Sequence, residues 1–254
     1  SYDGLWEAHP ELYEDPADSG RLILFYSEAS WDETARDQGF GSEQYWNREH
    51  LWPRSYGIGS SGADSSDLFH VVPANKAVNA DRSNKHFGEV EAGDDNLEVP
   101  AHPLVPECEE SRYEWEPGDA QKGWVARAML YMPTRYDYLE LVDIPEGTEL
   151  STSETLMAQK SVLLDWNRRF APTDKEELFN EAVYAEWQFN RNPYISFPEF
   201  ADAVHVDGPS WGDWRLRHFT LGELRDPTLS GDAADPDGDG LSNLLERARY
   251  SDPR

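Results

Sequence analysis

The sequence has very little of three things, and each shortage excludes a class of protein. Its 254 residues include one cysteine, Cys108, so no intramolecular disulfide can form. Apolar runs such as RLILFY at 21–26 are much shorter than the roughly 20 residues of a membrane helix, so no membrane partner is expected. Basic residues number 22 against 50 acidic ones, a net charge of −28, which excludes a broadly basic nucleic-acid-binding surface.

The negative charge is unevenly distributed along the chain. Residues 45–90 contain five basic and five acidic residues, so the whole excess of −28 lies outside this segment. An acidic exterior suits a protein in a salty medium, because at about 1 M salt the Debye length falls to about 3 Å and self-repulsion is screened. Salt-tolerant activity is one interpretation of this pattern, and simple solubility is the other.

The neutral segment predicts two strands and a helix. A strand or turn ends at Glu49-His50, a Gly/Ser-rich loop follows at 57–66, and DLFHVV at 67–72 reads as a short strand. Pro73 is then predicted to open a helix that Gly88 closes, since proline favours the first turn and glycine the position past the end. Trp46 and Trp52, which flank the acid–histidine pair, are expected to be core residues rather than base-stacking platforms.

This arrangement places polar groups together. Asn75, Asn79 and Arg82 are spaced i, i+4 and i+7, so they share one helix face. Carboxylate and amide oxygens are hard ligands suited to Mg²⁺. A histidine with an ordinary pKa of about 6.5 can take a proton from water, and arginine binds phosphate well.

These residues resemble a known family. NREHLWPRS and DLFHVVPANKAVNADRSNKHFG are similar to the bacterial endonuclease I family of His-Me finger (ββα-metal) nucleases. KGWVARAMLYMPTRY and NEAVYAEWQFNRNPYISFPEF continue the resemblance in the family's order, over roughly residues 20–200. The resemblance implies an α+β fold built around a ββα-metal motif with several packing helices. Members of the family include disulfide-rich secreted proteins, from which this chain departs.

The resemblance also implies roles for individual residues. His50 matches the family's general base, Glu49 a metal ligand and Asn79 the second metal ligand, with Mg²⁺ expected and Mn²⁺ or Ca²⁺ as alternatives. Arg82 and Arg54 are both candidates for the arginine near the scissile phosphate, and Arg48 is a third. His70 and Asn75 are candidates for a phosphate contact or for a position that supports the ligands, and for His70 a purely structural role is the alternative.

Three functions are compatible with these residues. The first is a secreted, metal-dependent, sequence-nonspecific endonuclease that hydrolyses DNA, with RNA left open, by a one-metal mechanism and leaves 5′-phosphate ends. It would be an extracellular monomer, with the periplasm as the alternative location. The second is an exported calcium-binding surface or adhesion protein with an inactive nuclease-like domain. The third, a site-specific HNH-type nuclease, lacks a recognisable DNA-reading module.

The remaining elements are mostly predicted helices. A strand is expected at 21–27, an acidic surface excursion at 89–118, a helix from Gln121 that Pro133 ends or kinks, and two further helices at 154–170 and 174–189. The composition changes beyond residue 205. We therefore expect a catalytic domain at 1–210 and a C-terminal tail at 211–254.

The tail contains a candidate calcium loop. DPDGDGLSNLLE at 235–246 fits the EF-hand pattern over its full length. Its oxygen ligands would bind Ca²⁺ in a structural site, the alternative being an acidic linker. The expected ligands are Asp235, Asp237, Asp239, Leu241 through its carbonyl, Asn243 and Glu246.

Overall fold

The structure is a computed structural model that describes residues 1–37, 39, 43–144, 155–206, 218–220, 222–223, 226–231, 233–238, 240–244 and 246. The chain divides into two compact units, Ser1–Ser196 and Phe197–Arg254. The predicted boundary between residues 210 and 211 falls outside the described residues, so where the catalytic domain ends stays a prediction.

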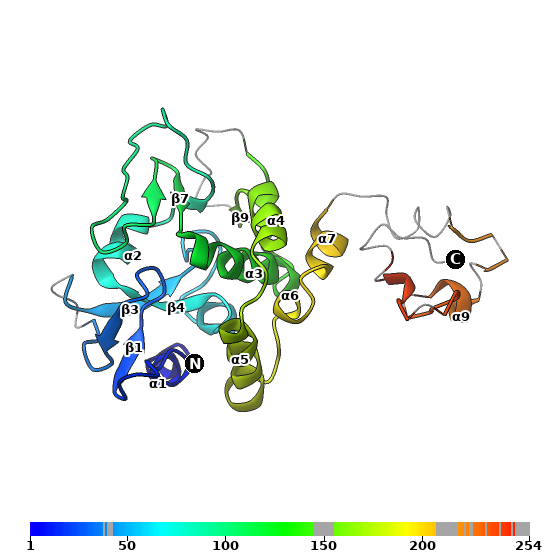
Figure 1. The fold of residues 1–254 in the computed structure, drawn as a ribbon, viewed down its shortest axis with the longest axis horizontal. Helices are drawn as coiled ribbons and strands as arrows, with labels where there is room; N and C mark the ends of the chain where they lie inside the picture. Colours follow the sequence, from blue (N-terminus) through cyan, green and yellow to red (C-terminus); the bar gives the residue numbers. More distant parts are fainter. Residues whose placement is uncertain are drawn as a thin grey trace. The chain divides into compact units, whose positions relative to one another are not determined.

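The first unit contains two antiparallel strands followed directly by a helix. β3 (Trp46–His50) pairs with β4 (Val71–Asn75), and α2 (Lys76–Arg82) continues from β4 and contacts both strands (Figure 1). β4 begins and ends later than the strand predicted at 67–72. The mixed α+β class and the ββα arrangement are both confirmed.

The helix of this motif starts later than predicted. Pro73 lies inside β4, where its carbonyl accepts a hydrogen bond from the Phe25 N–H at 2.8 Å. Asn75 caps α2 instead, because its side-chain oxygen accepts the Ala77 N–H at 2.9 Å. The helix ends at Ser83, whose positive φ of 54° turns the chain. The stretch predicted to stay helical up to Gly88 therefore includes a strand, β5 (His86–Phe87).

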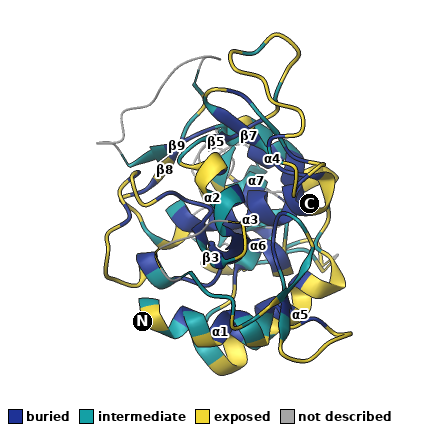
Figure 2. Ribbon diagram, turned by 90° about the vertical axis from the view of Figure 1, so that its left-hand side faces the viewer, coloured by how far each residue is buried: buried dark blue, intermediate teal, exposed yellow. Residues whose placement is uncertain are grey.

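The most deeply buried helix is α3 (Asp119–Arg135). Its residues 121–132 are all buried, and it packs against α4 (Lys160–Arg169) and α6 (Pro193–Ser196) (Figure 2). The predicted apolar face is present, but burial extends all round the helix. Pro133 does not end α3, which continues to Arg135.

The other elements of the first unit are short. The predicted strand at 21–27 is a strand only over its first three residues, and the acidic excursion carries two small strands. The helix predicted at 174–189 changes after Ala182 into a π-helical turn. These elements are η1 (Tyr2–Gly4), α1 (Leu5–Leu12), the pair β1 (Arg21–Ile23) and β2 (Ser30–Asp32), η2 (Asp64–Ser66), a sheet in the order β5, β7 (Glu114–Glu116) and β6 (Glu109–Glu110), the pair β8 (Glu140–Leu141) and β9 (Leu156–Met157), α5 (Asp174–Ala182) and η3 (Val183–Trp187).

Aromatic side chains fill much of the core. Trp46 and Trp52 are both 0% exposed, which confirms that they are core residues. In the second unit the described helices include α7 (Phe200–His205) and α9 (Pro227–Ser230). None of the helices that the structure describes has the length and apolar character to cross a bilayer.

Candidate active site

Glu49 and His50 end β3, and both side chains are largely buried. Glu49 is 2% and His50 7% exposed. Because successive residues of a strand point to opposite faces, the two side chains have different neighbours. Glu49 meets Tyr26 and the helix α2, whereas His50 meets the segment between the two strands.

The Glu49 carboxylate lies in a pocket with two polar partners. Its Oε1 accepts a hydrogen bond from the Tyr26 hydroxyl at 3.0 Å and lies 3.3 Å from an Arg82 guanidinium nitrogen. Burial raises the pKa of Glu49 to about 7, although Arg82 and Tyr26 both act to lower it. Burial, and not the lack of a partner, is thus what raises this pKa, and a cation next to the carboxylate would lower it again.

The His50 ring is oriented by the backbone of η2. Its Nε2 lies 3.2 Å from the Ser65 carbonyl oxygen. A carbonyl can only accept, so Nε2 carries the proton and the neutral ring has its lone pair on Nδ1. Burial lowers the pKa of His50 to about 3, and positive charge on His70, Arg54 and Arg48 acts in the same direction. His50 is thus held neutral, in one tautomer, with one nitrogen able to accept a proton.

Asn79 faces the same side of β3 as Glu49. Its Nδ2 donates to the Asn47 Oδ1 at 2.8 Å, and Asn47 shares a strand face with Glu49 because the two are two residues apart. Asn79 and Arg82, three residues apart, share a helix face. The amide pair Asn47–Asn79 and the ion pair Glu49–Arg82 therefore lie side by side between β3 and α2.

This arrangement brings the two predicted metal ligands together and adds Asn47, which sequence reasoning missed. The available signal was its position two residues before Glu49. Asn79 uses its amide nitrogen on Asn47, a bond that does not involve its Oδ1, which is the hard oxygen donor that the metal role requires. The residues present therefore fit a small divalent cation that keeps most of its waters.

Arg82 lies beneath the site rather than on its surface. It is 0% exposed, and its two terminal nitrogens donate to the carbonyls of His50 at 2.9 Å and Leu51 at 2.6 Å. Its guanidinium carbon is 4.5 Å from the centre of the Phe87 ring. A guanidinium so enclosed offers little to a phosphate. Arg82 instead orients the backbone that carries Glu49 and His50.

Two other arginines are close to His50. Arg48 stacks on Tyr2 and Trp6, with its guanidinium carbon 3.6 and 4.2 Å from the ring centres. Arg54 is exposed and lies 5.8 Å from the Tyr2 ring, which is itself 5.7 Å from the His50 ring. In a chain of net charge −28, this gives a positive, aromatic surface beside the histidine. The geometry favours Arg54 over Arg82 for a phosphate contact.

His70 and Asn75 have structural partners. His70 is 0% exposed, its Nε2 lies 2.6 Å from the Asp64 carbonyl oxygen, and its ring centre is 5.4 Å from that of His50. Asn75 caps α2 and donates to the Glu43 carbonyl at 2.8 Å. His70 thus packs beside His50, and Asn75 joins β4 to α2.

In the second unit the candidate calcium loop is folded around its first carboxylate. Asp235 accepts hydrogen bonds from the backbone N–H groups of Gly238 at 2.9 Å and Gly240 at 3.0 Å, and both glycines have positive φ. The Asn243 side chain is buried and donates to the carbonyls of Leu229 and Gly231. Glu246 is also buried, whereas Asp239 lies outside the described residues. The two other predicted ligands, Asp237 and Leu241, are among the described residues. Within the part of the chain that the structure describes, no three His, Cys, Asp or Glu side chains lie close enough together to hold a metal ion.

Comparison with known proteins agrees with this architecture. An extracellular ribonuclease of Bacillus amyloliquefaciens is 36% identical over 209 residues, which cover 80% of this chain and 68% of the relative. An extracellular ribonuclease of Bacillus subtilis (strain 168) is 34% identical over 209 residues, with the same shares covered. The Endonuclease I family matches residues 1–199, the part of the chain that carries the ββα motif and its packing helices. This chain therefore belongs to the endonuclease I family.

Proposed function

We propose that this chain is a secreted, metal-dependent endonuclease that hydrolyses phosphodiester bonds of DNA and RNA without sequence specificity. The observation that carries the proposal is that one ββα motif holds a neutral, oriented His50 directly after Glu49 on β3, with Asn79 on the helix that packs on this strand. The names of the two relatives support secretion and an RNA substrate. The monomeric state stays a prediction.

His50 acts as the general base in this proposal. Hydrogen bonding to the Ser65 carbonyl fixes the ring, so Nδ1 takes a proton from the attacking water. A pKa of about 3 is low for this task. A bound phosphodiester anion would raise it, because a nearby negative charge favours the protonated ring. Since the nucleophile is water and not a ribose hydroxyl, the same residues serve DNA and RNA. Water attacks phosphorus, the P–O3′ bond breaks, and the products carry 5′-phosphate and 3′-hydroxyl ends.

Glu49 and Asn79 would hold Mg²⁺, with Mn²⁺ or Ca²⁺ as alternatives. When bound, the ion would stabilise the charge that develops on the phosphate and on the leaving 3′ oxygen. Asn47 orients the Asn79 amide, and Arg82 holds the backbone at residues 50 and 51. Arg54, exposed beside His50, binds the scissile phosphate.

The tail loop at 235–246 is proposed to bind Ca²⁺ in a structural role. The turn around Asp235, closed by the N–H groups of Gly238 and Gly240, supports this proposal. Millimolar extracellular calcium would fill such a site. The alternative, a calcium-binding surface protein without nuclease activity, would share this loop and differ only in the outcome of a cleavage assay.

The test is digestion of supercoiled plasmid and of a long RNA with Mg²⁺, Mn²⁺ or Ca²⁺, followed by mapping of the product ends. We expect nicking and degradation with a divalent ion, no activity in EDTA, and 5′-phosphate ends. Intact plasmid and RNA under every ion and salt condition would reject the nuclease proposal and favour the calcium-binding surface protein.

A further inference from the structure

A cavity of about 310 Å³ lies in the first unit, next to the candidate active site. Two of its walls also contact His50. The turn η2 contributes Ser66 to the cavity, while its preceding residue, Ser65, holds the His50 ring. The turn η1 contributes Gly4, while its Tyr2 ring lies 5.7 Å from that of His50. The cavity and the His50 ring therefore share the turns η1 and η2 as neighbours.

The floor of the cavity is rigid. Asp67 is 4% exposed and accepts four hydrogen bonds, from the Tyr131 and Tyr136 hydroxyls at 2.9 Å and from the Gln188 amide and the Phe69 N–H at 3.0 Å. The Gln188 amide oxygen in turn accepts the Leu68 N–H at 3.0 Å. The polar atoms of Asp67 and Gln188 are thus used by hydrogen bonds within the protein, and a ligand would have to bind to the other side chains that line the cavity.

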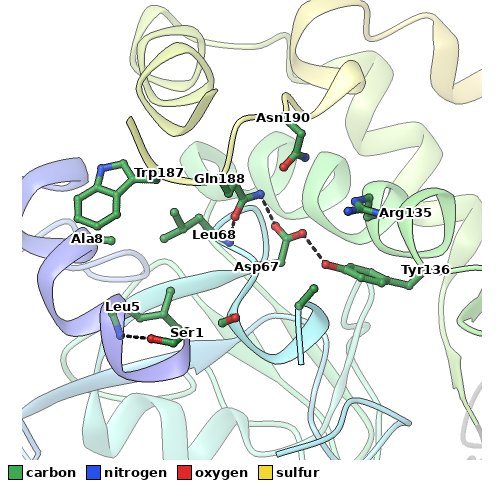
Figure 3. A pocket seen from close by; sticks show the side chains of 13 residues that line it. Ser1, Leu5, Ala8, Asp67, Leu68, Arg135, Tyr136, Trp187, Gln188 and Asn190 are labelled. Carbon is green, nitrogen blue, oxygen red and sulfur yellow. Dashed lines mark hydrogen bonds between the residues drawn. The ribbon is translucent and has the colours of Figure 1, made fainter. Parts of the chain in front are cut away.

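The groups left for a ligand are those that recognise a nucleotide. Figure 3 shows Trp187 and Arg135 on opposite sides of the cavity, with Leu68 and Asp67 between them. Trp187 is half-buried and ends the π-helical turn η3, an irregularity that is frequent at functional sites. Arg135 is exposed and stacks on Tyr136 at 5.4 Å. Asn190 donates to the Tyr131 hydroxyl at 2.8 Å, a bond that does not use its amide oxygen.

We propose that this cavity binds one unstacked base of the substrate strand, next to the bond that is cut. Trp187 provides the stacking surface, Asn190 a hydrogen-bond acceptor for a base edge, and Arg135 a cation for the adjoining phosphate. The cavity volume is at the lower end of small-ligand sites, which suits a single base. A base can enter only when it leaves the stack, so single-stranded segments are preferred over duplex.

This inference rests on the proposed nuclease function, and its test separates the two. The probe is a short single-stranded DNA oligonucleotide, compared with copies that carry one abasic position at each site around the mapped cut. The wild-type chain, Trp187→Ala and the matched control Tyr184→Ala are assayed for kcat and KM. Tyr184 lies on the same turn and is exposed, but it does not line the cavity.

For the wild type, an abasic residue at one position near the cut should raise KM about tenfold, the effect of losing one base–aromatic stack. Trp187→Ala should show that loss with the intact oligonucleotide and no further loss with the abasic copy, while Tyr184→Ala behaves as wild type. The inference is overturned if no abasic position matters, or if Trp187→Ala keeps the abasic penalty.

A second measurement, of binding alone, tests the base site even if the protein has no cleavage activity. His50→Ala with Mg²⁺ is titrated with the same oligonucleotides by fluorescence anisotropy. An abasic penalty in binding supports the base site even if cleavage fails, whereas equal binding of all copies rejects it. A wild type that cuts every copy equally leaves the nuclease proposal standing and removes only the base site.

Discussion

Replacing Arg82 with methionine should destabilise the first unit strongly. The guanidinium is 0% exposed and joins the Glu49 carboxylate, the His50 carbonyl and the Leu51 carbonyl. Methionine fills similar space but leaves a buried carboxylate and two carbonyls without their cation. Breaking a buried pair on one side costs about 3–5 kcal/mol. For a unit of this size, that corresponds to a fall in Tm of about 10 °C.

The Glu49→Gln variant supplies the control for this estimate. In the Glu49→Gln background there is no carboxylate charge, so Arg82→Met leaves only the two carbonyls without a donor. The double variant should therefore lose less unfolding free energy than the two single variants lose together. Thermal unfolding in EDTA measures all four proteins without a bound ion. A fall in Tm of less than about 2 °C for Arg82→Met would refute the argument, because the interaction would then contribute under about 1 kcal/mol.

Salt dependence distinguishes the two roles proposed for arginine. Removing a phosphate contact lowers the slope of log K against log salt by about one, whereas removing a positioning residue leaves the slope unchanged. We therefore expect a smaller slope for Arg54→Ala and an unchanged slope for Arg82→Met, measured by oligonucleotide binding in the His50→Ala background. A smaller slope for Arg82→Met and an unchanged slope for Arg54→Ala would instead indicate that Arg82 contacts the phosphate.

Three further predictions concern salt, pH and calcium. If the excess of acidic residues outside 45–90 is an adaptation to brine, cleavage should persist at several hundred millimolar NaCl; a steady fall in activity from low salt upward would contradict this. Burial lowers the pKa of His9 to about 3 and of His70 to about 4. Because an unfolded histidine titrates at about 6.5, stability should be full above that pH and fall on acidification, by about 2 kcal/mol per histidine at about pH 5. Urea unfolding at about pH 5 and at about pH 7 checks this, and His9→Gln should reduce the dependence; an unchanged dependence would contradict the reasoning. Calcium should raise the unfolding temperature of the wild-type chain by calorimetry but not that of Asp235→Ala, and an equal response of both would reject the tail site.

The sequence predicted the components of the site better than their geometry. The ββα motif followed from the family resemblance, which Glu49-His50 and Asn79 carry in the family's order, while spacing alone indicated only that Asn79 and Arg82 share a helix face. The predicted start of α2 was wrong because proline is compatible both with the first turn of a helix and with an edge strand. The side-chain cap from Asn75 decided between them.

Burial and long-range partners were not predictable from spacing. Arg82 looked like a surface phosphate ligand on a polar helix face, but the carbonyls of residues 50 and 51 and the Phe87 ring enclose it. The same limit applies to the cavity, whose lining comes from η1, η2, the end of α3 and residues 187–190. Only the folded chain brings these distant segments together.

The most direct test of the account is the cleavage rate of His50→Ala with saturating Mg²⁺ on a single-stranded oligonucleotide. We expect kcat to fall by about 10²–10⁴, the usual contribution of a general base, while oligonucleotide binding stays within a few-fold of wild type. A variant that retains kcat within about tenfold of the wild type would contradict the account, because the base would then lie elsewhere.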